Sequence, residues 1–304
     1  MDTWYNFYWN IVDDNQLGVA GKAVNRFVRR FVKRHLDKVL PTYFMQNPVE
    51  CGVNRTQQRQ RRLVCSMTSF PARIDEVWVS VETLFRQTVK ADEIILWLSK
   101  DQFAGRELPA SIRRCEEKGL TIRWVEGDIR SHKKYYYVLQ EYKDADVVLV
   151  DDDLYYPDGL LENLAAMAAR HPGAICATRV HRMAYSDESL NLYAKWVHNF
   201  NPRKEGCSKD YFFTSGAGTL IPTGLMPEET FNKEVFQEIC FFADDVWLNE
   251  MARLAGVDIF TNDKYDKDEI SIGGSQQVKL VKTNVLSGGN DTQIEAVRKY
   301  FNIQ

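Results

Sequence analysis

The segment Ala145-Asp-Val-Val-Leu-Val-Asp-Asp-Asp-Leu-Tyr-Tyr-Pro157 is the strongest indication of the fold in this chain. Its apolar run, Val147 to Val150, is short, mostly β-branched and does not alternate, which is typical of a parallel strand buried on both faces. The run ends at three consecutive carboxylates, Asp151, Asp152 and Asp153. Ligands of open α/β sheets bind beyond the carboxyl ends of the strands, where these aspartates are expected.

The chemistry of this aspartate triplet favours a divalent cation. Three adjacent negative charges repel one another unless a cation joins them. Hard oxygen ligands favour Mg²⁺ or Mn²⁺, and such sites often combine one or two carboxylates with phosphate oxygens of a substrate. A solvated acidic turn is the alternative explanation for the triplet taken by itself.

On both sides of this stretch, short apolar runs alternate with amphipathic segments. Such alternation is typical of a doubly wound, Rossmann-like parallel sheet, although the G-x-G-x-x-G fingerprint of dinucleotide folds is missing. We therefore predict an α/β fold with a mostly parallel central sheet and flanking helices. The predicted strands begin at Leu63, Glu93, Leu120, Val147 and Ala174, and the predicted helices cover Ile74–Gln87, Ser131–Tyr142 and Leu160–Ala169.

Composition narrows the class of protein. With 304 residues and 44% hydrophobic content, the chain is long enough for a large core. A net charge of −3 argues against a general nucleic-acid binder. The six cysteines form no CxxC pair, which favours reduced thiols, and no signal peptide or membrane-spanning run is evident. We expect a cytoplasmic protein, soluble or peripheral on the inner face of the plasma membrane.

Residues 1–62 differ from the rest and are predicted to form a helical extension before a catalytic domain at 63–304. Between Leu17 and Leu40, apolar residues recur at helical spacing among many Lys and Arg side chains, with Asp37 as the single acid. One explanation is a basic amphipathic helix in an anionic membrane interface. The other is a helix packed on the catalytic domain with its cationic face in water.

Two further segments offer groups that suit a nucleotide. The loop after the first strand carries the Thr68 and Ser69 hydroxyls and the Arg73 guanidinium, which suit a base or a diphosphate. Lys133 and Lys134 precede an aromatic helix, and their ammonium groups suit phosphate. Ordinary loop hydroxyls and a surface basic pair are the alternative explanations.

A second acidic cluster, Asp244 and Asp245, follows two phenylalanines and comes after the small-residue loop Thr214–Thr219. Burial and a neighbouring like charge both raise the pKa of a carboxyl group, towards values useful for a general base. The alternative is that one of these aspartates is the N-cap of a helix covering Val246–Leu254.

Taken in order, six motifs resemble bacterial glycosyltransferases of the GT-A fold, and more narrowly those that assemble capsular polysaccharide or lipopolysaccharide. The resemblance covers roughly Leu63 to Phe301. The motifs are SMTSFPAR from Ser66, EIILWLSKDQF from Glu93, RSHKKYY from Arg130, VVLVDDDLYYP from Val147, TSGAGTLIP from Thr214 and ADDVWLNEMA from Ala243.

The resemblance implies transfer of a sugar from a nucleotide-sugar donor, expected to be a UDP-sugar, to an oligosaccharide or lipid-linked acceptor. Asp153 would bind Mn²⁺ or Mg²⁺, with Asp151 as a second carboxylate that also contacts the nucleoside. Asp152 would contact the ribose or donor sugar. Asp245, beside Asp244, matches the base that deprotonates the acceptor in inverting members. The resemblance also gives base and ribose contacts to Thr68, Ser69 and Arg73, and diphosphate contacts to Lys134 and Lys133.

Three alternatives remain open. A haloacid-dehalogenase-type phosphatase also places Asp-x-Asp after an apolar strand, but normally with Thr or Val two residues after the second aspartate. A nucleotidyltransferase that makes nucleotide sugars shares the nucleotide-binding architecture, but would need a Gly-rich loop where Ser66–Arg73 stands. The third is a non-catalytic sugar-binding protein of the same fold.

Overall fold

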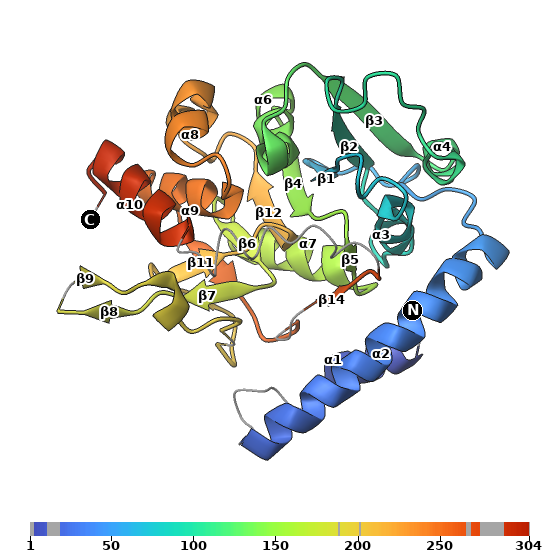
Figure 1. Ribbon diagram of the computed structural model, residues 1–304, viewed down its shortest axis with the longest axis horizontal. Helices are drawn as coiled ribbons and strands as arrows, with labels where there is room; N and C mark the ends of the chain where they lie inside the picture. The colour runs from blue at the N-terminus through green and yellow to red at the C-terminus, as the bar shows by residue number, and fades with distance from the viewer. Residues whose placement is uncertain are drawn as a thin grey trace.

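An eight-stranded sheet forms the centre of the computed structural model, which describes residues 3–10, 19–187, 189–200, 202–265, 269–273 and 289–303. The strand order is β10-β13-β6-β12-β4-β1-β2-β3 (Figure 1). Its strands are β1 (Arg62–Thr68), β2 (Glu93–Ser99), β3 (Leu120–Val125), β4 (Ala145–Val150), β6 (Ile175–Ala177), β10 (Gly206–Cys207), β12 (Ala217–Pro222) and β13 (Ile259–Thr261).

The pairing of these strands is mostly parallel. β1 lies between β2 and β4, β3 follows β2, and β6 pairs with β13, all in parallel. β12 is antiparallel to both β4 and β6. The predicted Rossmann-like α/β fold is therefore confirmed. The prediction of one loop over Thr214–Thr219 is wrong from Ala217 onwards, because that segment begins a central strand.

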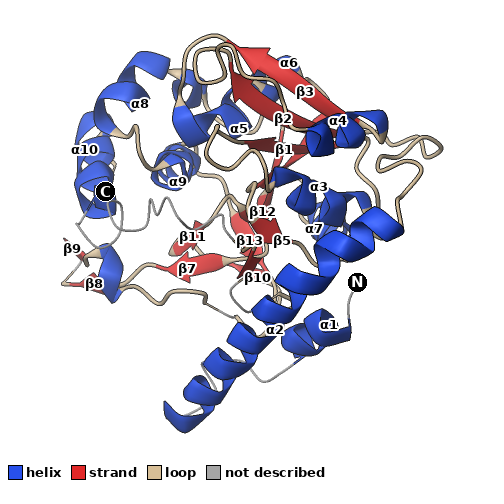
Figure 2. Cartoon of the chain, turned by 45° about the vertical axis from the view of Figure 1, so that its right-hand side comes forward, coloured by secondary structure: helices blue, strands red, loops and turns tan. Residues whose placement is uncertain are grey.

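Helices cover both faces of the sheet, as Figure 2 shows. Alternate residues of β4 face opposite sides, so Val147 and Leu149 join one buried cluster while Val148 and Val150 join the other. The helices are α3 (Val77–Phe85), α4 (Ala110–Glu117), α5 (Lys133–Tyr136), α6 (Val138–Glu141), α7 (Leu160–Arg170), α8 (Lys233–Ile239), α9 (Asp244–Leu254) and α10 (Gly289–Phe301).

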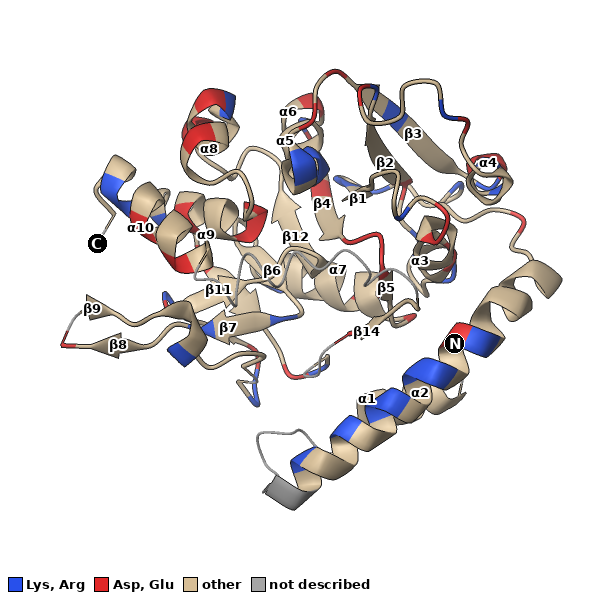
Figure 3. Ribbon diagram, in the orientation of Figure 1, with Lys and Arg blue, Asp and Glu red and all other residues tan. Residues whose placement is uncertain are grey.

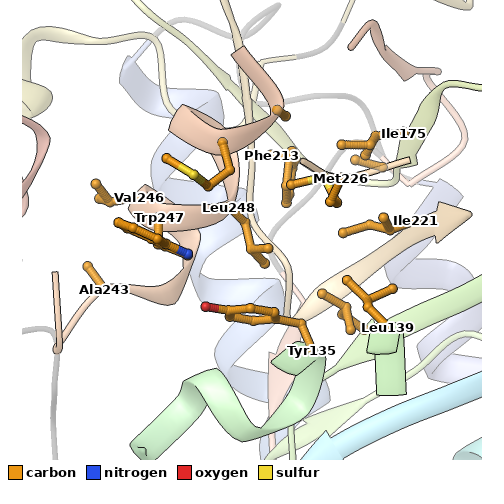
Figure 4. Close-up of a cluster of buried hydrophobic side chains, with 14 of the residues drawn as sticks. Tyr135, Leu139, Ile175, Phe213, Ile221, Met226, Ala243, Val246, Trp247 and Leu248 are labelled. Carbon is orange, nitrogen blue, oxygen red and sulfur yellow. The ribbon is translucent and has the colours of Figure 1, made fainter. Parts of the chain in front are cut away.

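One of these clusters fixes α9 against α5 and β12. Trp247 and Leu248 of α9 pack with Tyr135 of α5 and Ile221 of β12, and all four side chains are fully buried (Figure 4). The Trp247 indole donates a hydrogen bond to the Thr230 carbonyl at 2.9 Å, so its polar atom has a partner. The residues at the start of α9 and α5 are therefore held by a rigid core.

The N-terminal extension forms α1 (Thr3–Asn10) and α2 (Val19–Gln46), and α2 continues six residues beyond the predicted end. Leu36 and Phe44 of α2 are buried against Tyr155 and Ile270. These two residues belong to the short strands β5 (Leu154–Tyr155) and β14 (Ile270–Ser271), which pair with each other. β5 follows the aspartate triplet directly in sequence. Among the described helices, none combines the length and the apolar composition that crossing a membrane requires.

Short elements occupy the stretch from residue 178 to 213, which the sequence indicates only as irregular. Apart from β10, which lies at the edge of the central sheet, they pair locally. They are β7 (Val180–Arg182), β8 (Tyr185–Ser186), β9 (Ser189–Leu190), a 3₁₀ turn at Tyr193–Lys195 and β11 (Tyr211–Phe213).

Candidate active site

The candidate site lies where β1, β4 and β12 meet. β1 and β4 are parallel neighbours, so their carboxyl ends lie at the same edge of the sheet. Antiparallel β12 begins at this edge, with Ala217 opposite Val150. The loops that follow β1 and β4, and the loop that precedes β12, therefore converge.

Arg73 contacts the last two residues of the aspartate triplet. Its Nη1 lies 2.9 Å from Asp152 Oδ1 and 3.1 Å from Asp153 Oδ2. The Ser69 hydroxyl donates to the other Asp152 oxygen at 2.5 Å. Asp152 is only 5% exposed, and its two carboxylate oxygens are bound by Ser69 and Arg73 within the protein. The two predicted nucleotide contacts, Ser69 and Arg73, thus lie against the triplet itself.

Burial raises the pKa of the Asp153 carboxyl to about 7, and the neighbouring charge of Asp151 adds to the effect. The pKa of Asp152 is also raised, first by burial, although Arg73 acts in the opposite direction. A cation beside Asp153 would relieve the repulsion between these carboxylates.

Asp151 contacts a different basic residue and is more accessible, with its side chain 41% exposed. Its carboxylate oxygen Oδ1 lies 3.0 Å from Lys134 Nζ. Gly216 permits this position, because a Cβ there would lie 1.8 Å from Asp151 Oδ2. The Tyr156 hydroxyl accepts from the Asp151 amide at 2.6 Å and donates to the Gly216 carbonyl at 2.6 Å. No sequence pattern indicates this bridge by Tyr156, because its two partners lie on separate strands and loops.

Lys134 joins the triplet to the second acidic cluster. Its Nζ also lies 2.9 Å from Asp244 Oδ2, and its side chain is 5% exposed. Burial disfavours the charge, but Asp151 and Asp244 outweigh it and raise the Lys134 pKa, so the ammonium is charged at neutral pH. The Ser66 hydroxyl donates to the Lys134 carbonyl at 2.5 Å and accepts from the Trp97 indole at 2.9 Å. Lys134 is therefore positioned through both its backbone and its side chain.

Asp244 and Asp245 form the first turn of α9, where the helix dipole favours negative charge. The N-cap is Ala243, so the alternative of an aspartate N-cap is wrong. The Ser215 amide donates to Asp245 Oδ1 at 2.9 Å, and the Ser215 hydroxyl donates to the same oxygen at 2.5 Å. The sequence indicates Ser215 only as part of a small-residue loop, because its role as a donor depends on a contact across 30 residues.

These two adjacent carboxyl groups have opposite pKa shifts. Burial acts against the charge of both. For Asp244, the Lys134 charge and then His132 overcome burial and lower its pKa to about 2. For Asp245, burial and the neighbouring Asp244 charge raise its pKa to about 6. The pKa of Asp245 is thus close to the value expected of an effective general base at neutral pH.

Two residues predicted to bind the nucleotide, Lys133 and Thr68, contact neither acidic cluster in the structure. Lys133 forms an ion pair with Asp128 and reaches Gln102 Oε1 at 3.5 Å, so its ammonium does not join the aspartates. The Thr68 hydroxyl donates to the Trp97 carbonyl at 2.8 Å and ties the end of β1 to β2. The structure therefore brings together Ser69, Arg73, Lys134 and both acidic clusters, without Lys133.

The donor set at the site fits a divalent cation that takes further ligands from a substrate. Within the described residues, no group of three or more His, Cys, Asp or Glu side chains is arranged to hold a metal by itself. Five carboxylates nevertheless surround two cationic side chains, which leaves a formal excess of negative charge. A cation bound by Asp153 and Asp151 would offset this excess, and Mg²⁺ sites commonly use few carboxylates and several phosphate or water oxygens.

A scan against models of protein families finds no match for this chain, and neither does a search of curated proteins. Among solved structures, a 4-diphosphocytidyl-2C-methyl-D-erythritol synthase from Anaerococcus prevotii is similar, at 16% identity and a TM-score of 0.44. That match covers 75% of this chain and 96% of the other. A mannosyltransferase from Pyrobaculum calidifontis, in complex with GDP-Man and Mn²⁺, has 12% identity and a TM-score of 0.43, covering 94% of this chain and 80% of the other. Because both TM-scores are below 0.5, we transfer no ligand or residue role from either.

Proposed function

We propose that this protein is a GT-A glycosyltransferase that moves a sugar from a nucleotide-sugar donor to an acceptor hydroxyl with inversion. The observation that carries the proposal is the double contact of Lys134 with Asp151 and Asp244. This contact brings the aspartate triplet, a buried ammonium group and Asp245, whose pKa is raised, into one site, which supports the proposal.

On the donor side, Asp153 and Asp151 would hold Mn²⁺ or Mg²⁺, which neutralises charge on the leaving diphosphate when bound. An ammonium has three N–H donors, and Asp151 and Asp244 take two of those of Lys134. The third suits a phosphate oxygen. We assign Ser69 and Arg73 the task of holding the triplet, because both contact Asp152 directly.

On the acceptor side, Asp245 would accept the proton of the attacking hydroxyl. The acceptor oxygen then bonds to the anomeric carbon as the bond from that carbon to the diphosphate breaks on the opposite face. Asp244 keeps its negative charge because of its low pKa, and so continues to hold Lys134 in place. The division of tasks follows from the two pKa values.

The raised pKa of Asp245 favours sugar transfer over nucleotidyl transfer. In nucleotidyl transfer the nucleophile is a phosphate, which is already ionised and needs no base, so Asp245 would have no task. The acceptor we propose is a saccharide or lipid-linked saccharide of a bacterial surface polysaccharide, used at the cytoplasmic face of the membrane.

The test is to incubate the protein with a panel of nucleotide sugars, beginning with UDP-sugars, together with Mn²⁺ or EDTA, and to identify the products. A nucleoside diphosphate released only with metal, together with a glycosylated acceptor or free sugar, supports the proposal. Pyrophosphate formed from a nucleoside triphosphate and a sugar phosphate would indicate a nucleotidyltransferase. Inorganic phosphate released from a phosphate monoester would indicate a phosphatase.

A further inference from the structure

An apolar patch on the N-terminal extension faces away from the rest of the protein. We call it the outer patch and define it by Trp4 and Phe7 of α1 and by Val24, Phe27 and Phe31 of α2. Their exposed fractions range from 45% for Trp4 to 72% for Phe27. The Trp4 ring lies edge-on to Phe31 at 5.3 Å between centroids and to Phe7 at 6.1 Å, so the patch continues across both helices.

Packing of α2 on the rest of the protein does not use the outer patch. The opposite side of α2 supplies Val32, Leu36, Leu40 and Phe44, which are at most 2% exposed. These residues form a buried cluster with Tyr155 and other side chains near the triplet. The extension is therefore attached through one apolar face, which is buried, and the outer patch is a second apolar face, which is exposed.

Exposed cations lie along α2, the helix that carries most of the outer patch. Figure 3 shows Lys and Arg recurring along α2. The exposed ones are Lys22, Arg26, Arg30, Arg34 and Lys38. The one acid of α2, Asp37, is directed inward, where it accepts hydrogen bonds from the Tyr155 hydroxyl at 3.0 Å and the Gly273 amide at 2.8 Å. Over the described residues of α1 and α2, the outward surface thus combines aromatic and cationic groups with no outward acid.

We propose that the outer patch docks the protein on an anionic lipid surface, with α2 lying in the plane of the interface. Aromatic and aliphatic side chains enter the boundary between headgroups and acyl chains, while Arg and Lys extend to the lipid phosphates. Exposed aromatic side chains suit the apolar part of such a lipid surface, and side-chain charges that are all positive suit its anionic headgroups. This inference does not depend on the reaction that the site performs.

The experiment measures binding of the full chain to vesicles of phosphatidylglycerol and phosphatidylcholine by co-sedimentation, with pure phosphatidylcholine vesicles as the comparison. We expect binding to the mixed vesicles that weakens as salt is raised, and at least tenfold weaker binding to pure phosphatidylcholine. Absence of binding to the mixed vesicles, or equal binding to both kinds, would overturn the proposal.

Two variants separate the contributions. Phe27→Ser with Phe31→Ser should weaken binding by about tenfold or more, because each phenylalanine loses its apolar burial. Arg26→Glu with Arg30→Glu should weaken it by at least 25-fold, because each cation contributes roughly fivefold near an anionic surface. Circular dichroism checks that both variants fold, and the vesicle comparison on the unaltered chain does not need them.

Matched controls change the same residue types elsewhere on the surface. Tyr185→Ser with Leu192→Ser removes exposed apolar side chains outside the extension, and Arg113→Glu with Arg114→Glu reverses exposed charges on α4. Both controls should bind like the unaltered chain. If they weaken binding as much as the patch variants do, the attraction is general and the proposal fails. Light scattering that shows a dimer disrupted by Phe27→Ser would assign the patch to a second copy instead.

Discussion

The aspartate triplet and the aspartate pair lie on two sides of Lys134 but are stabilised in different ways. In the triplet, one guanidinium, from Arg73, contacts both Asp152 and Asp153. In the pair, Asp245 instead receives the amide and hydroxyl of Ser215. Asp152 and Asp153 therefore share the charge of Arg73, whereas in the pair, among the described residues, only Asp244 contacts a cation, Lys134, and Asp245 depends on hydrogen bonds from Ser215.

The two aspartates of the pair differ from each other in the direction of their pKa shifts. Asp244 and Asp245 are consecutive and both lie in the first turn of α9. Lys134 and His132 act on Asp244 and lower its pKa to about 2, while burial and Asp244 raise that of Asp245 to about 6. Neighbouring groups, and not residue type, thus separate a carboxyl group of low pKa from one whose pKa is close to neutral.

The largest effect is expected from removing the link between the clusters. Lys134→Met leaves Asp151 and Asp244 without their shared cation, so the free energy of unfolding should fall by about 3–5 kcal/mol and turnover should be lost. Lys133→Met is the matched control. Its partner Asp128 is better solvated, with 27% of its side chain exposed, so the loss should be smaller, about 1–3 kcal/mol. Urea unfolding measures both. An equal or reversed order would contradict the central position of Lys134.

The next effect separates the two members of the pair. Asp245→Asn should lower kcat by roughly 10²–10⁴-fold, because the acceptor hydroxyl loses its base. The protein should remain folded, since Ser215 can still donate to the amide oxygen. Asp244→Asn should instead lower thermal stability, because Lys134 loses a buried partner. Steady-state kinetics and thermal unfolding of both variants test this. Full turnover in Asp245→Asn would remove Asp245 from the reaction.

The pH dependence sharpens the same comparison. Only ionised Asp245 accepts a proton, so kcat/KM should rise with pH through about 6, the raised pKa of its carboxyl group. Ser215→Ala removes a hydrogen bond that favours the ionised form, so this limb should move to higher pH by about one unit. A pH–rate profile of the two proteins measures the shift. A limb that stays in place, or moves to lower pH, would argue against Asp245 as the titrating group.

The smallest effect concerns the contact of the extension with the triplet. Tyr155 lies two residues after Asp153 and donates its hydroxyl to Asp37 of α2. Tyr155→Phe should lower the free energy of unfolding by about 1 kcal/mol and leave the acid limb of Asp245 unchanged. Tyr185→Phe, at an exposed tyrosine, serves as the control and should change neither quantity. A shifted acid limb in Tyr155→Phe would mean that the two clusters are not separately supported.

The sequence predicted the parts of the fold that depend on local patterns. Strands β2 and β3 begin at Glu93 and Leu120, as the sequence predicted. β2 is buried, which fits its continuous apolar run, whereas β3 is an edge strand with two exposed residues. The segment Ala217–Pro222 was not predicted as a strand. Its glycine and small residues are typical of a loop, and only pairing with β4 and β6 makes it a strand.

In the site, residue types were predictable but their partners were not. Asp151 and Asp245 were singled out from position and composition, yet Lys134 connects their clusters across 17 residues on one side and 110 on the other. Lys133 and Lys134 are indistinguishable in sequence. Only the direction of each side chain on α5 sends one to Asp128 and the other to the aspartates.

The most direct test of the central claim is a calorimetric titration of the accepted nucleotide sugar, with Mn²⁺ present, into Asp153→Asn and Asp245→Asn. We propose that the first carboxylate serves the metal and the donor and that the second serves the acceptor. This division of tasks predicts that Asp153→Asn loses the Mn²⁺-dependent part of donor binding, while Asp245→Asn binds the donor with nearly unchanged affinity and transfers no sugar. Loss of donor binding in Asp245→Asn, with binding retained in Asp153→Asn, would contradict it.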